Sequence, residues 1–231
     1  TRALVDNRVG NYNVAIGDSA LFWNRNGPNI GIGNRALFNN VTGFQNNAIG
    51  SFSLSSISNG NYNVSIGDSS SRNLTSGSNN VVLGSWAFKD HTSGNLNTAI
   101  GNFALGERES GNENTAVGGG SLWNTNNNAN TGIGSLAGFT NIAGTKNVFL
   151  GANSDALASN LTNASAIGAN AYVGQSNSMV LGSINGVNGA MASVNVGIGT
   201  IAPDSTFSVA NSFSVGNSGT IQFPNIGTMI N

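Results

Sequence analysis

The chain has 231 residues, of which 39% are hydrophobic and only 7% are charged, and its net charge is -1. An ordinary soluble domain has roughly 25% charged residues, so Asn, Ser, Thr and Gly must supply the polar surface here. The charge balance provides no basic patch for nucleic acid or a membrane surface. Because the sequence has no cysteine, it excludes disulfides and thiolate-bound metals, and no apolar run is long enough to insert into a membrane.

A motif of about 17 residues recurs through most of the chain. It is visible at once in GNYNVAIGDS (10–19) and GNYNVSIGDS (60–69). Each copy contains an aliphatic residue followed by a glycine, which we call the anchor glycine. The anchor glycines follow one another at spacings of 14, 16 or 17 residues and are Gly17, Gly33, Gly50, Gly67, Gly84, Gly101, Gly118, Gly134, Gly151, Gly168, Gly182 and Gly199.

The three residues before each anchor glycine alternate large, small and large, as in Val14–Ile16. Alternation at period two predicts a strand with two different faces. We expect the large side chains to fill a core and the small ones to form a bare stripe on the surface. A second apolar element after the anchor glycine, such as Ala20–Phe22, predicts a second strand in each copy.

Asparagine stands four residues before most anchor glycines. An amide at the same corner of every coil can donate to one neighbouring copy and accept from the other, which predicts a hydrogen-bonded ladder. The alternative is that asparagine only tolerates the turn conformation. These asparagines are Asn13, Asn29, Asn46, Asn63, Asn80, Asn97, Asn114, Asn130, Asn147 and Asn195.

Two short strands and two turns per copy predict an all-β fold, a parallel β-roll (solenoid). We expect about twelve coils of 16–17 residues over 1–199, followed by a short β-rich stalk or connector over 200–231, where the period disappears. Because a bare stripe on a chain with few charges leaves apolar surface exposed, we also expect a homo-oligomer.

The segments NNAIG, NTAIG and NVAIG, and above all NASAIGANAYVGQSNSMVLGS (163–183), resemble the head repeats of trimeric autotransporter adhesins, the YadA-like head. The resemblance covers roughly 10–183, although the family's usual 14-residue spacing occurs only between Gly168 and Gly182. It implies a homotrimer, an extracellular position at a cell surface, and attachment to a host or environmental surface through protein or glycan.

Two other functions fit parts of the sequence. NVGIGTIAP (195–203) resembles junctions in phage tail fibres and bacterial surface proteins, so a virion-like tail fibre is the alternative. An ice-binding protein is a weaker alternative, because it needs a flat outward array of threonines. We expect Thr98, Thr115 and Thr131 to face inward with the valines of the same strand position.

Several aromatic and polar residues follow an anchor glycine by five to eight positions and should lie on one outer edge. Aromatic rings beside polar groups can stack on sugars or anchor a protein partner. The alternative is that the tryptophans cap the core. The candidate binding residues are Trp23, Arg25, Lys89, His91, Arg108 and Trp123.

Nothing in the sequence indicates an enzyme, a cofactor or a metal site. Glu107 and Glu109 have the residue types of a glycosidase pair, but we expect them in a solvated loop without a cleft. Asp18 and Asp68 are isolated carboxylates that supply too few oxygens for calcium. His91 is the only histidine, and we expect it in a solvated loop rather than as a ligand or base.

Overall fold

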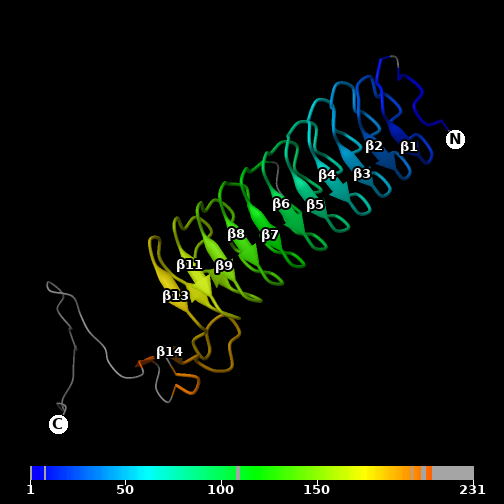
Figure 1. Cartoon of the computed structure of the whole chain (residues 1–231). Helices are drawn as coiled ribbons and strands as arrows, with labels where there is room; N and C mark the ends of the chain where they lie inside the picture. The colour runs from blue at the N-terminus through cyan, green and yellow to red at the C-terminus, as the bar shows by residue number, and fades with distance from the viewer. Residues whose placement is uncertain (1, 8, 108–109, 199, 204–206, 210–231) are drawn as a thin grey trace, which may run out of the picture. The chain divides into compact units, whose positions relative to one another are not determined.

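The computed structural model describes residues 2–7, 9–107, 110–198, 200–203 and 207–209. The chain divides into two compact units, Thr1–Ser193 and Val194–Asn231. The first unit is a stack of coils, each of which contributes one short strand to a parallel sheet that runs along the stack (Figure 1). The described residues contain strands and no helices, so the predicted all-β solenoid is confirmed.

The sheet of the first unit has 11 strands in the order β1-β2-β3-β4-β5-β6-β7-β8-β9-β11-β13. Neighbouring strands pair in parallel at equivalent positions of the repeat, as Ala99 does with Ala116. The strands are β1 (Val14–Ile16), β2 (Ile30–Ile32), β3 (Asn47–Ile49), β4 (Val64–Ile66), β5 (Val81–Leu83), β6 (Thr98–Ile100), β7 (Thr115–Val117), β8 (Thr131–Ile133), β9 (Val148–Leu150), β11 (Ser165–Ile167) and β13 (Met179–Leu181).

The strands face the opposite way from the sequence prediction. Their small central residues, such as Ala48 and Ala116, are completely buried, while the flanking aliphatic residues point outward. Ile16 is 59% exposed and Leu150 is 42% exposed. The predicted bare stripe of small residues is therefore wrong, and the exposed stripe is aliphatic.

The reason is the narrowness of the coil. The opposite wall lies so close to the strand that a Cβ atom added at Gly132 would sit 2.8 Å from Cγ of Leu122. Only a small central residue generally leaves room for a leucine from the other wall, although Phe149 fits where the facing residue is Gly138. The interior is thus filled mainly from the second wall.

The threonines of the strands also face the opposite way from the prediction. Thr98, Thr115 and Thr131 share the outward strand position with the valines and are half-buried, so the prediction that they face inward is wrong. They occupy three consecutive strands, and aliphatic residues continue the column on both sides, as Val81 and Val148 do.

The second wall is not a strand in most coils, which corrects another prediction. The residues two and four positions after the anchor glycine have left-handed backbones, as in Phe103 (φ 57°) and Leu105 (φ 48°). Such φ values are incompatible with a β-strand. The coils are still hydrogen-bonded here, because Leu105 N donates to Ser121 O at 3.0 Å.

A short second sheet does form near the end of the first unit. β10 (Asp155–Ala156) pairs in parallel with β12 (Tyr172–Val173). In the second unit, β14 (Val196–Ile198) pairs in parallel with β15 (Phe207–Val209), so the last copy of the repeat motif lies outside the 11-stranded sheet. The alternating residues after position 209 lie outside the described part of the chain.

Candidate functional site

Most of the periodic asparagines form a buried ladder between the coils, whereas Asn195 is exposed and its Nδ2 donates to Pro203 O at 3.2 Å. Asn80 Oδ1 accepts hydrogen bonds from the backbone N of Asn97 at 3.0 Å and from its Nδ2 at 3.1 Å. Asn80 Nδ2 donates to Asn63 Oδ1 at 2.9 Å and to Gly94 O at 2.8 Å. The left-handed turn residue is the one before the asparagine, such as Leu96 (φ 58°), so these asparagines are not selected for tolerance of that conformation.

We expect Asn80→Ala to lower the free energy of unfolding by about 3 kcal/mol, because the variant removes the hydrogen bonds of the buried Asn97 backbone N and Gly94 O and one of the bonds to Asn63 Oδ1. Asn95→Ala is the matched control. Asn95 also bonds to the next coil, through Asn112 Oδ1, but it is exposed, so water can replace its bonds and the loss should stay below about 1 kcal/mol. Urea denaturation of both variants tests this, and equal losses would contradict a structural role specific to the buried ladder.

The candidate binding residues that the structure describes have different surroundings. Trp23 is exposed, and Arg25 is paired with Asp6, with 2.7 Å between Nη2 and Oδ2. Lys89 is half-buried, with Nζ lying 4.9 Å from the centroid of the Trp86 ring. Arg108 lies outside the described residues.

His91 is completely buried, which corrects its predicted place in a solvated loop. Its ring stacks on Phe88, with 3.9 Å between centroids and 9° between planes. Burial lowers the pKa of His91 to about 3, although backbone groups of Ser93 and Leu105 oppose this effect. Neither ring nitrogen makes a hydrogen bond of good geometry to a described group. The histidine is therefore a neutral core residue at neutral pH.

The repeat contains the signal that would have placed His91 correctly. The position seven residues after the anchor glycine is Ile57 and Leu74 in the two preceding coils, and both are completely buried. The same column also holds Asn24 and Asn40, whose polarity makes the position resemble a loop although both are buried.

Trp123 belongs to a row of aromatic residues that runs along the second wall, which we call the aromatic ladder. Its members occur two or five positions after an anchor glycine and are half-buried or exposed. They are Phe22, Phe38, Phe52, Trp86, Phe103, Trp123 and Phe139.

Ring contacts connect successive coils along this ladder. Phe22 and Phe38 are stacked with 5.2 Å between centroids. Trp123 stacks on Phe103 at 5.0 Å with only 6° between the planes, and Phe103 in turn lies 6.3 Å from Trp86. Trp123 Nε1 is buried without a hydrogen-bond partner among the described residues, and the ring stacks on Phe103 of the preceding coil. This tryptophan therefore packs within the second wall and is only half-buried, so part of its ring remains on the surface.

Basic side chains are interleaved with the rings. The Arg35 guanidinium lies 5.4 Å from the Phe38 centroid and 5.8 Å from the Phe52 centroid, and that of Arg72 lies 4.9 Å from Phe52. The candidate list from the sequence missed both arginines. They occupy different positions of the repeat and come from different coils, so they meet at Phe52 only when the coils are stacked.

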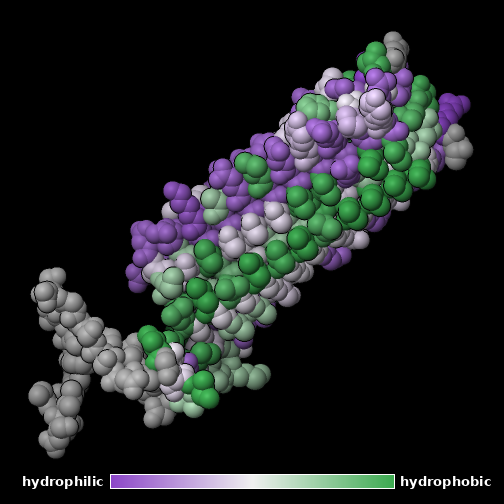
Figure 2. All heavy atoms as spheres, viewed as in Figure 1, coloured by the Kyte–Doolittle hydropathy of each residue, from purple (hydrophilic) through white to green (hydrophobic). Residues whose placement is uncertain are grey.

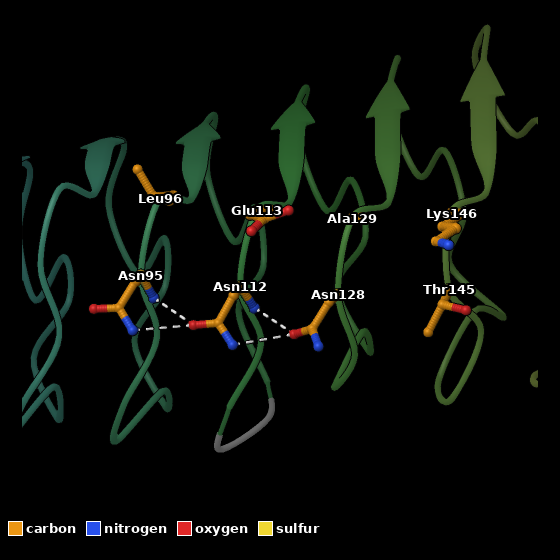
Figure 3. Close-up of a pocket in the computed structure, with 8 residues that line it drawn as sticks. All are labelled: Asn95, Leu96, Asn112, Glu113, Asn128, Ala129, Thr145 and Lys146. Atoms are coloured by element: carbon orange, nitrogen blue, oxygen red, sulfur yellow. Dashed lines mark hydrogen bonds between the residues drawn. The ribbon is translucent and has the colours of Figure 1, made fainter.

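A second candidate is an open groove of about 590 Å³ at the corner where the chain enters the strands (Figure 3). Exposed amides form its floor: Asn95 Nδ2 donates to Asn112 Oδ1, and Asn112 Nδ2 donates to Asn128 Oδ1. Glu113 and Lys146 also line the groove, and Figure 3 shows both near the row of amides. Because these amides form hydrogen bonds between coils, part of their hydrogen-bonding capacity is already used.

Among the residues that the structure describes, no group of three or more His, Asp or Glu side chains converges, and no helix is long and apolar enough to cross a bilayer. Glu107 is exposed, and Glu109, the other half of the possible glycosidase pair, lies outside the described residues. Comparisons with protein-family models, with curated proteins and with solved structures found no match.

Proposed function

We propose that this chain is the non-enzymatic, trimeric β-roll head of an extracellular adhesin, and that it attaches a cell to a surface. The observation that carries the proposal is the aliphatic face, formed by the outward residues of the 11-stranded sheet. Those outward positions include no charged residue. Figure 2 shows rows of hydrophobic residues that run along the stack on this side.

Further copies of the same chain are the occupants that fit this face best. The sheet repeats its outward pattern once per strand, roughly every 4.8 Å, over its whole length. A partner with the same spacing over 11 strands is another copy of the solenoid. The net charge of -1 causes little repulsion between copies. Cyclic closure buries the aliphatic face of every copy, and the number three comes from the resemblance to the adhesin heads.

The same arrangement leaves the aromatic ladder available for attachment. The strand and the second wall meet across the core, since Cβ at Gly31 would lie 3.1 Å from Cγ of Leu21. Outward residues of the second wall therefore face away from the sheet. Packing of the sheets against one another leaves the rings and arginines of the aromatic ladder at the periphery.

We expect the wild-type protein to have three times the chain mass of 23.4 kDa in light scattering after size exclusion. Ile100→Asp should dissociate it, because the change buries three carboxylates together at the interface, each at a cost of several kcal/mol. Leu157→Asp is the matched control, since Leu157 is 64% exposed and lies outside the sheet. A monomeric wild type, or an Ile100→Asp variant that stays trimeric, would refute the proposed interface.

Attachment itself is tested with beads coated with the trimer and presented to a glycan array and to cultured cells. We expect retention of the beads without any change in the mass of the bound glycans. Glycan cleavage would contradict the non-enzymatic role, and absence of retention on every surface would contradict attachment.

A further inference from the structure

We propose that Arg35 and Arg72, which both stack on Phe52, form a binding site for an anionic saccharide, one that bears carboxylate or sulfate groups. This inference rests on the proposed function, since it names the class of ligand that the attachment face takes. The site is a groove of about 270 Å³ on the aromatic ladder, lined also by Phe38, Asn39 and Ser56.

The first observation is the convergence of two positive charges on one ring. Arg35 belongs to the coil before Phe52 and Arg72 to the coil after it, and both guanidinium carbons lie within 6 Å of the Phe52 centroid. Neither guanidinium forms an ion pair with a carboxylate of the described residues, whereas Arg25 and Lys89 each have such a partner. Two like charges brought together repel each other, and a bound anion offsets that repulsion because it is attracted to both.

The second observation is preorganisation. Arg35 and Phe52 occupy equivalent left-handed positions in successive coils, with φ of 53° and 58°. Their backbones are fixed by hydrogen bonds to the preceding coils, from Arg35 N to Asp18 O at 2.9 Å and from Phe52 N to Asn34 O at 2.8 Å. Contact with the ring restricts both guanidinium groups, so binding loses less side-chain entropy than it does with free arginines.

The composition of the groove favours a saccharide over a free anion. Guanidinium groups bind carboxylate and sulfate through paired N–H donors. The half-buried rings of Phe38 and Phe52 offer apolar faces on which a sugar ring stacks, and Asn39 and Ser56 offer polar groups for its hydroxyls. A volume of about 270 Å³ is below the range for drug-sized ligands, which suits one or two sugar units of a longer chain.

The position on a repeating stack suits a polymeric ligand. Lys89 lies over Trp86 farther along the same ladder, although Asp90 partly neutralises it at 3.5 Å. In the proposed trimer, three copies of the arginine site engage one polysaccharide or several neighbouring chains, which raises the apparent affinity without any new contact.

The test uses the full chain and surface plasmon resonance with immobilised polysaccharides. Heparin carries sulfate and carboxylate, hyaluronate carries carboxylate only, dextran sulfate carries sulfate only, and dextran is neutral. We expect binding to heparin and to at least one singly functionalised polymer, and none to dextran. Binding to hyaluronate would show that the site accepts carboxylate, and binding to dextran sulfate would show that it accepts sulfate. The affinity should decrease as salt increases, because exposed charges are screened.

The decisive variants are Arg35→Gln with Arg72→Gln, and the matched control is Arg25→Gln, which removes a positive charge already paired with Asp6. The double variant should bind heparin at least about tenfold more weakly, while Arg25→Gln should stay within about twofold. Arg35→Lys with Arg72→Lys keeps the charge but loses the planar donors, so it should fall between these two.

Equal weakening by Arg25→Gln and the double variant would overturn the site in favour of a general charge effect. Unchanged binding in the double variant, or binding to dextran as strong as to heparin, would also overturn it, as would no binding to any anionic polymer. Light scattering on the same samples separates this site from the proposed function. A trimer that attaches to cells but ignores the arginine changes refutes the site alone, while a monomer with arginine-dependent heparin binding refutes the trimer alone.

Discussion

Replacing Gly118 by alanine should lower the free energy of unfolding by about 4 kcal/mol. The anchor glycine at this position has φ of +131°, which an L-residue rarely adopts. An added Cβ atom would also lie 2.4 Å from Gly134 O and 2.6 Å from Gly134 C in the next coil. Because both atoms belong to the backbone, the coils themselves must separate to accommodate the methyl group.

The neighbouring glycine provides the matched control. Gly119 does not have a left-handed backbone, and the only atom near a Cβ added there is Asn102 O at 3.8 Å, an ordinary contact distance. Gly119→Ala should therefore change the free energy of unfolding by less than about 1 kcal/mol. Urea denaturation followed by circular dichroism compares the two variants. Equal stabilities would show that the anchor glycine is not required by the stacking of the coils.

Replacing His91 by leucine should remove much of the acid sensitivity of the fold. The pKa of His91 is about 3 in the folded chain and 6.5 in the unfolded chain, so the unfolded state binds more protons between these values. Stability is therefore fully present above pH 6.5 and falls as pH decreases toward 3. The loss amounts to about 1.4 kcal/mol per pH unit, or about 3 kcal/mol by pH 4.5.

The measurement is the difference in unfolding free energy between wild type and variant at pH 7.5, 6 and 4.5. His91→Leu places in this coil the residue that Leu74 already provides in the preceding one, so the core should accept it. His91→Asn, which introduces the residue type of Asn40 in the same column, tests titration apart from hydrophobicity: it should show the same weakened pH dependence as the leucine variant. A difference from wild type that does not grow at low pH would show that His91 is not a buried neutral base.

The repeat allowed much of the solenoid to be predicted residue by residue. Gly118 and its equivalents mark the same corner of each coil, and Asn80 and its equivalents mark the corner where the amide ladder forms. These features are local or recur from coil to coil, so a period of about 17 residues is enough to locate them. The binding residues were less predictable, since Arg35, Phe52 and Arg72 come from three different coils and meet only when those coils stack.

By itself, the sequence determined that this protein is a stack of parallel coils, because each copy of the motif repeats the same strand, glycine and asparagine. Only the tertiary structure decided which side of each strand faces inward. Alternation at period two distinguishes two faces but does not say which is buried, and the outcome depends on the space between two walls that are not adjacent in sequence. Leucines such as Leu122, brought inward by left-handed residues of the second wall, occupy that space. The same competition for volume buries His91 and places the aliphatic residues of the strands on the outward side of the sheet.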